Sequence, residues 1–200
     1  MTNLLDQSRF AEAIAAIDQA NSEDPNMIDR DGEARPAELV YAERMTAMLD
    51  RIYPDASEAL QLAVRAQHLK RWMVPRSTYP DGRKGYLRWR NDLKLRHAEL
   101  AGEILDRSGY DAEMLARVQS LIRKERLKQD PDSQALEDTA CLVFLTHYFA
   151  TFATKYDDAK LVNILRKTWA KMSAKGQEYA LQLQLPDKHR QLIEQALMDE

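Results

Sequence analysis

The segment QALEDTACLVFLTHYFATFAT, residues 134–154, decides the fold of this 200-residue chain. Its last fifteen residues, 140–154, carry no formal charge, and the apolar ones fall on every side of a helical projection. A helix that is apolar all round is normally buried at the centre of a domain. Asp130 and Pro131, just before the segment, match an N-cap followed by proline at the first helical position. The sequence therefore predicts a central buried helix that opens at these two residues.

Two acids, Glu137 and Asp138, lie at the start of the apolar run. Asp138 shares a helical face with three residues that we expect to be almost fully buried, namely Cys141, Leu142 and Leu145. A carboxylate that faces a core needs a base, several hydrogen-bond donors or a metal ion as its partner. Acids also favour the positive N-terminal end of a helix. That second account suffices for Glu137, whereas both interpretations stay open for Asp138.

The composition favours helices along the whole chain. Only six glycines and seven prolines occur, while Ala, Leu, Glu, Gln, Lys and Arg are abundant, and these six types have the highest helix propensities. Charged residues make up 30% and hydrophobic ones 44% of the chain, the balance of a soluble globular protein. No long stretch alternates apolar and polar residues as a strand would. We therefore expect an all-α fold with a single compact domain over residues 1–200.

Apolar stripes at helical spacing, together with capping residues, set the expected boundaries of the helices. Pro36 begins the second helix, and Asp55 followed by Glu58 resembles a capping box at the start of the third. Asp111 caps the fifth helix. Polar loops are expected at 21–35 and 75–85. The expected helices cover 8–20, 36–53, 55–74, 86–107, a stretch from 111, the central segment, 156–173 and two shorter C-terminal stretches, the last from Pro186.

Cysteine usage and hydropathy indicate a cytoplasmic protein. The single cysteine, Cys141, excludes an internal disulfide, and the chain has no secretory signature. The N-terminal residues are amphipathic and include acids, unlike a signal peptide. The central apolar run is too short and too rich in Thr, His and Tyr to be a good membrane span. We expect no membrane partner.

A strongly basic segment runs from Arg65 to Arg96. It holds ten Lys or Arg residues and two acids, a local charge of +8, whereas the whole chain carries −3. Such an asymmetry favours an anionic ligand or an acidic protein face. The planar guanidinium groups of arginine suit bidentate binding of phosphate. The competing interpretation is a solvated charged surface with no ligand.

Two of the four histidines are candidate ligands. His97 lies on the apolar stripe of its helix, where a histidine is more often part of the core than a metal ligand. His68 lies beside Trp72 and several arginines. With Asp138 these histidines would place three ligands on three helices, a pattern that has no diagnostic spacing. A structural role for both histidines, in a helical scaffold without a site, is the alternative.

The segment Lys171 to Lys175, KMSAK, resembles the Lys-Met-Ser-Lys-Ser loop of class I aminoacyl-tRNA synthetases. Those enzymes need a nucleotide-binding α/β domain with a His-Ile-Gly-His element, and this chain has neither. A helix that ends at Ser173 explains the segment. The chain also has no glycine-rich phosphate loop and no nucleophile elbow.

Several stretches together resemble an uncharacterised domain-of-unknown-function family, whose members are sometimes mislabelled glutamyl-tRNA synthetase-like. The resemblance spans nearly the whole chain, and it implies no established activity. It is carried by AIDQANSEDPN, ELVYAERMTAML, AQHLKRWMVPRSTYPDGRKGYLRWR, LEDTACLVFL and ILRKTWAKMSAKG.

The order of elements from Glu38 to Leu145 distantly resembles the HD superfamily of metal-dependent phosphohydrolases, which are all-helical. In RAQHL, His68 occupies the position of the dyad histidine, and HAELAGEIL makes His97 an auxiliary ligand. ALEDTACL matches the late helix that carries an aspartate, which implies Asp138 as a ligand. The resemblance implies an HD-like core at about 36–155, followed by C-terminal helices at 156–200.

The chain departs from the HD pattern at three places. Leu69 occupies the position of the dyad aspartate, and Lys124-Glu125 stand where some members have another histidine. The first histidine of the pattern has no counterpart. Glu38 is nearest to its position and is able to ligate a hard cation.

The resemblance implies a pocket for a phosphate-bearing small molecule or a nucleotide, and a metal-dependent phosphohydrolase if the pocket is catalytic. A divalent metal ion held by Glu38, His68, His97 and Asp138 would activate a water. The phosphoryl oxygens would be neutralised by Arg65, Arg71, Arg76 and Lys124. The alternative is a non-enzymatic module that binds RNA or a protein, with its aromatic residues stacking on bases.

Overall fold

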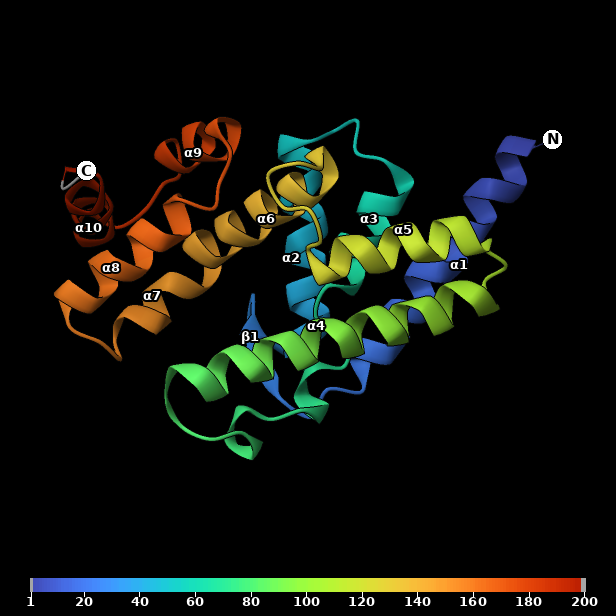
Figure 1. Cartoon of the computed structure of the whole chain (residues 1–200), viewed down its shortest axis with the longest axis horizontal. Coiled ribbons are helices and arrows are strands. Elements are labelled where there is room, and N and C mark those ends of the chain that lie inside the picture. The colour runs from blue at the N-terminus through green and yellow to red at the C-terminus, as the bar shows by residue number, and fades with distance from the viewer. Residues whose placement is uncertain (1, 199–200) are drawn as a thin grey trace.

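The computed structural model describes the backbone of residues 2–198 and the side chains of residues 7–198. Helices make up most of this part, so the expected all-α class is confirmed (Figure 1). The helices are α1 (Thr2–Ser22), α2 (Ala37–Ile52), α3 (Glu58–Ala66), α4 (Gly82–Arg107), α5 (Ala112–Arg123), α6 (Pro131–Val143), α7 (Phe149–Ala153), α8 (Asp158–Trp169), α9 (Ala174–Leu181) and α10 (Asp187–Met198). Between α3 and α4 lie two short 3₁₀ turns, η1 (Arg71–Met73) and η2 (Arg76–Thr78).

Capping side chains begin several helices where the sequence predicts it. The Asp130 carboxylate accepts hydrogen bonds from the backbone N–H groups of Asp132 and Ser133, with Pro131 in the first turn of α6. Asp111 caps α5 by accepting from the N–H of Met114. An N-cap of this kind stabilises a helix by about 1 kcal/mol, because the first N–H groups have no partner within the helix.

The expected loop at 21–35 contains a small antiparallel hairpin of β1 (Met27–Arg30) and β2 (Glu33–Pro36). Asp31 and Gly32 form its two-residue turn, with φ angles of 59° and 87°, and two successive positive φ values are those of a type I′ turn. Four-residue strands are too short for an alternating pattern to reveal them. Arg30 and Arg35 both bind Glu43, which fastens the hairpin to α2.

The central segment is buried as predicted only in its first part, because residues 146–147, 150–151 and 154 are exposed, and it is not one continuous helix. Cys141 is 6%, Leu142 0% and Leu145 4% exposed, which confirms the expectation for these three side chains. A π-helical turn, η3 (Phe144–Tyr148), separates α6 from α7. Such turns are frequent at functional sites, because they re-aim the side chains that follow.

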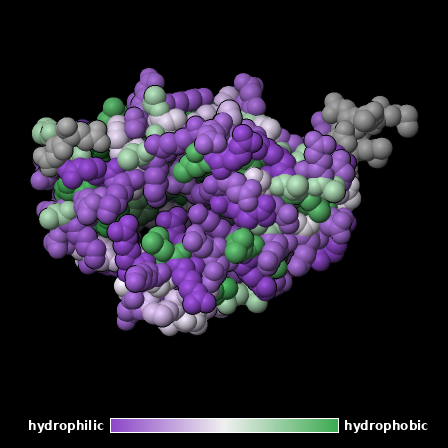
Figure 2. All heavy atoms as spheres, viewed as in Figure 1, coloured by the Kyte–Doolittle hydropathy of each residue, from purple (hydrophilic) through white to green (hydrophobic). Residues whose placement is uncertain are grey.

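The helices gather at two ends of the molecule. Figure 1 shows α4 and α5 lying side by side, with α7, α8 and α10 at the opposite end and α2 and α6 between them. A short connection that contains Gly109 joins α4 to α5. The face in Figure 2 is mostly hydrophilic and is hollowed left of its centre, where hydrophobic side chains show in the depth. No helix in the described part of the chain is both long enough and apolar enough to cross a membrane.

Candidate functional site

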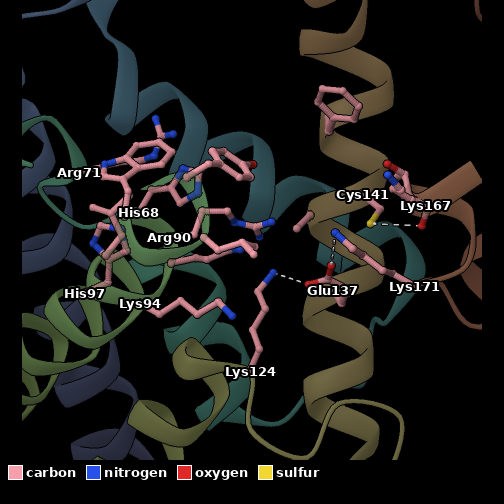
Figure 3. A pocket seen from close by; sticks show the side chains of 18 of the residues that line it. His68, Arg71, Arg90, Lys94, His97, Lys124, Glu137, Cys141, Lys167 and Lys171 are labelled. Carbon is pink, nitrogen blue, oxygen red and sulfur yellow. Dashed lines mark hydrogen bonds and ion pairs between the residues drawn. The ribbon is translucent and has the colours of Figure 1, made fainter. Parts of the chain in front are cut away.

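A cavity of about 820 Å³ opens between α4, the end of α5, α6 and α8. Its volume lies in the range of small-molecule binding sites. Among the described residues that line it, seven are Lys or Arg and one is an acid, Glu137. Figure 3 shows most of these charged groups, which approach one another from helices far apart in the chain. The basic residues are Arg71, Arg83, Arg90, Lys94, Lys124, Lys167 and Lys171.

Glu137 lies among the cations on the α6 side of the cavity (Figure 3). Its carboxylate binds the Lys124 ammonium and lies 3.7 Å from the ammonium of Lys171. The side chains of Glu137 and Lys124 are only 6% and 9% exposed. Burial acts to raise the pKa of Glu137, but the two lysines outweigh it and lower the pKa to about 2. The helix-end account of Glu137 is therefore insufficient, because this carboxylate is the counter-ion of a buried basic cluster.

The backbone at the end of α5 brings Lys124 into this cluster. Lys124 is the C-cap of α5 and has a left-handed conformation, with φ at 57°. Glycine is the usual residue at such a position, because any side chain is strained there. Strain of this kind persists where the surrounding structure fixes it, and it concentrates at functional sites. The turn aims the Lys124 side chain at Glu137 instead of continuing the helix.

One face of α4 supplies three further polar groups to the cavity. Arg90, Lys94 and His97 follow one another at spacings of four and three residues, so they lie on the same side of the helix. Burial lowers the pKa of Lys94, and the nearby charges of Arg90, Lys124 and Lys171 lower it further. The cavity is thus positive enough to disfavour one of its own charges.

At the other end of the cavity, Glu38 organises a histidine and an arginine. Its carboxylate oxygens lie 3.3 Å from His68 Nδ1 and 3.5 Å from the Arg71 guanidinium. Burial acts to raise the pKa of Glu38, yet His68 and Arg71 outweigh it and the pKa is lowered. The His68 ring stacks on Tyr41 at 4.0 Å between centroids, and the Arg71 guanidinium lies 5.0 Å above the ring of Trp89. Burial lowers the pKa of His68 despite Glu38, so this imidazole is mainly neutral at pH 7.

His97 lies beside His68, with 5.9 Å between the two ring centroids. It is 3% exposed, and its Nδ1 lies 2.7 Å from the carbonyl oxygen of Leu69. A neutral ring with its proton on Nδ1 fits this contact, and it leaves Nε2 as an acceptor. Burial lowers the pKa of His97 to about 3, and Nε2 has no hydrogen-bond partner. The two predicted histidines therefore do meet.

Asp138 does not join these histidines, which corrects the predicted convergence. Its carboxylate is fully buried and accepts hydrogen bonds from Tyr53 Oη at 2.6 Å and from Gln134 Nε2 at 2.9 Å. It also accepts from the backbone N–H and the hydroxyl of Ser173, at 2.8 and 2.5 Å. Ser173 in turn caps α9. Asp138 therefore has hydrogen-bond donors as its partners, one of the interpretations left open. The expected helix end at Ser173 is wrong, because α8 ends at Trp169 and Ser173 begins α9.

The divalent-metal centre implied by the HD resemblance does not fit these positions. Asp138 faces α9, so the set of Glu38, His68, His97 and Asp138 is not assembled. In the part of the chain that the structure describes, no group of three or more His, Cys, Asp or Glu side chains is placed to hold a metal ion. The two histidines instead contact Glu38, Tyr41 and the carbonyl oxygen of Leu69.

Two of the four predicted phosphate-binding residues line the cavity, and two do not. Arg71 and Lys124 are in its wall. Arg65 donates two hydrogen bonds of 2.6 Å to Asp18, which ties α3 to α1. Arg76 donates to the carbonyl oxygens of Tyr79 and Pro80 at 2.8 and 2.9 Å, so it closes the loop before α4. Arg65 and Arg76 are therefore not among the residues that line the cavity, and their guanidinium groups are engaged within the fold.

Sequence reasoning missed five of the seven basic cavity residues, namely Arg83, Arg90, Lys94, Lys167 and Lys171. Lys94 could have been found from its position on the helical face of His97. The two α8-side lysines had no such signal, since their approach to the cavity depends on tertiary packing. Cys141 also lines the cavity, but burial raises the pKa of its thiol to about 12. A thiol in that state is a poor nucleophile.

Comparisons with curated proteins and with solved structures find no match to this chain. A family model, described as "Domain of unknown function (DUF4202)", matches residues 11–193. The matched range contains α2, α4, α6 and α8, and with them every charged residue of the cavity wall. The chain therefore belongs to the DUF4202 family, a domain of unknown function.

Proposed function

We propose that the cavity binds a phosphate-bearing small molecule. The observation that carries this proposal is the charge of the wall, with seven basic side chains against one carboxylate in a recess of about 820 Å³. Cations that converge without enough counter-ions repel one another, and an anion in their midst relieves that repulsion. Lysine and arginine are the usual phosphate-binding side chains.

The rest of the wall favours a ligand with a ring, such as a nucleotide. Tyr86, Trp89, Phe144 and Phe152 contribute aromatic surface to the same cavity. Sites for such ligands combine apolar walls with a few convergent polar groups. An aromatic or sugar ring against these side chains, with its phosphate on the lysines, would use both kinds of surface.

The proposal also includes a relationship to the HD superfamily, but only in the fold. It is supported by the proximity of His97 on α4 to His68 in the turn that follows α3, because the resemblance names both residues as ligands. The hydrolytic reaction through a metal ion is not part of the proposal, because the ligand set does not assemble. The proposed activity is binding of the phosphorylated molecule.

Thermal unfolding with a panel of anions tests the proposal. Inorganic phosphate, pyrophosphate and AMP should raise the unfolding temperature, while adenosine and chloride of matched ionic strength should not. A ligand that binds only the folded state stabilises it by about 2.7 kcal/mol at one hundred times its Kd. No stabilisation by any phosphate compound would refute the proposal.

A matched pair of variants on α8 locates the binding site. Lys167 lines the cavity, whereas Lys160 is exposed and lies over the ring of Tyr156. Lys167→Gln should weaken phosphate binding by about fivefold or more, the effect of one charge at contact distance in a partly solvated site. Lys160→Gln should leave it unchanged. Equal effects of the two substitutions would place the anion elsewhere.

The competing hypothesis, a surface that binds along an RNA backbone, predicts a different dependence of the affinity on salt concentration. Each lost phosphate contact would then flatten the slope of log K against log salt by about one unit. Tight, steeply salt-dependent binding of single-stranded RNA, without stabilisation by small phosphates, would favour that function.

A further inference from the structure

Lys94 differs from the other lysines of the cavity. Lys124 and Lys171 share the carboxylate of Glu137, and Lys167 is exposed. Lys94 is partly buried, and among the described residues its ammonium has no carboxylate within ion-pair distance. Figure 3 shows its side chain reaching from α4 towards Lys124, into the space between the two sides of the cavity.

The surroundings of Lys94 disfavour its charged form, so the pKa of its ammonium is lowered. Burial is the first cause that lowers its pKa, and the charges of Arg90, Lys124 and Lys171 add to it, while Glu137 only partly opposes them. A lysine that is desolvated and lies next to other cations is the arrangement that activates an amine as a nucleophile.

We propose that Lys94 is a nucleophilic lysine that forms an imine with the carbonyl group of a phosphorylated aldehyde or ketone. This inference rests on the proposed function, because the phosphate must lie on the neighbouring cations. It is carried by the position of Lys94 inside the cavity, by its lack of a carboxylate partner and by the three cations around it. It narrows the ligand class from phosphate-bearing molecules to those that also carry a carbonyl group.

The reaction balances without any further reactant. The lone pair of the neutral Lys94 amine attacks the carbonyl carbon, so a C–N bond forms and the carbonyl oxygen becomes a hydroxyl group. That oxygen then leaves as water with both protons of the amine, and a C=N bond remains. Nothing is oxidised or reduced. The neighbouring ammonium groups would hold the phosphate while the carbonyl carbon is under attack.

Pyridoxal 5′-phosphate is a suitable probe, because it carries an aldehyde and a phosphate on one aromatic ring. The protein is mixed with about one equivalent of the probe, and borohydride then reduces any imine to a stable amine that peptide mass spectrometry locates. Lys94→Arg keeps the charge and removes the amine. Lys84→Arg is the matched control, because Lys84 is an exposed lysine on the same helix that does not line the cavity.

The expected result is a single modified position, Lys94, whose modification is lost in Lys94→Arg, kept in Lys84→Arg and suppressed by inorganic phosphate. Modification spread evenly over exposed lysines, or an undiminished level in Lys94→Arg, would overturn the inference. If phosphate stabilises the protein but Lys94 stays unmodified, the imine is refuted and the anion site stands. If phosphate neither stabilises nor protects, both proposals fall.

Discussion

Replacing Glu137 with glutamine removes the one acid among the described residues that line the cavity while keeping the shape of the side chain. It leaves Lys124, 9% exposed, without its carboxylate partner. Two opposite effects follow from this change. The free protein should lose stability, because a buried ammonium becomes unpaired, and the affinity for anions should rise, because their competitor is gone.

The pKa of Glu137 gives the size of the first effect. It falls from an ordinary value of 4.5 to about 2, and each unit corresponds to about 1.4 kcal/mol. The charge of this carboxylate therefore contributes about 3 kcal/mol at neutral pH, a figure that the 6% exposure of the side chain does not reduce much. A folded-state pKa below the unfolded one gives stability that is present above pH 4.5 and lost as the pH falls towards 2.

Urea unfolding of wild type and Glu137→Gln, with and without phosphate, measures both effects. At pH 7 the variant should be less stable by about 3 kcal/mol, and the difference should shrink below about pH 4.5. Phosphate should bind the variant at least about fivefold more tightly, since one opposing charge at contact distance is removed. Glu99→Gln, an exposed acid on α4, is the control. Equal stability of variant and wild type at pH 7, or weaker binding of phosphate, would refute the reasoning.

Three further substitutions test the packing around the site. Leu145→Asp should lower the free energy of unfolding by about 4 kcal/mol or more, because a side chain that is 4% exposed becomes an unpaired charge. Urea unfolding measures this, and Leu95→Asp, at a position that is 51% exposed, should have little effect. Asp138→Ala should cost about 3 kcal/mol and increase amide hydrogen exchange in α9, because Ser173 loses two hydrogen bonds. The pKa of His97 is lowered to about 3 in the folded state, so the unfolded chain takes up the proton first and stability falls with decreasing pH below about 6.5. His97→Gln should remove about 2–3 kcal/mol of that loss at about pH 4.5, and an unchanged pH profile would contradict the assignment.

The start of α6 shows how far local chemistry predicts this fold. Asp130 and Pro131 carry their signal in sequence, because capping uses backbone groups two or three residues away. Burial of Leu142 and Leu145 also follows from local periodicity, since no charged residue shares their face apart from Asp138. The π-helical turn that interrupts the segment had no such signal, because the apolar pattern on both sides is the same.

The site was harder to predict than the fold, and the exchange of roles between Glu137 and Asp138 shows why. Adjacent residues on a helix point about 100° apart, so one of the two acids faces the cavity and the other faces α9. Which side of α6 faces the cavity depends on tertiary packing, which brings Lys124 and Lys171 to Glu137 from other parts of the chain. On the other side of α6, Ser173 at the start of α9 holds Asp138. Pairings between residues so far apart in the chain cannot be predicted from the spacing of neighbouring residues.

The small number of counter-ions in the cavity supports the proposal that it binds an anionic ligand. A wall that served only stability would be expected to bring one carboxylate to each cation, as Asp18 does for Arg65 and Glu23 does for Lys70 elsewhere in the protein. In the cavity, one carboxylate serves Lys124 and Lys171 together, and Lys94 has none. Burial is the largest cause that lowers the pKa of Lys94, and the positive charges of its neighbours lower it further. An incoming phosphate would supply the missing negative charge, so binding and stability in this protein should rise together.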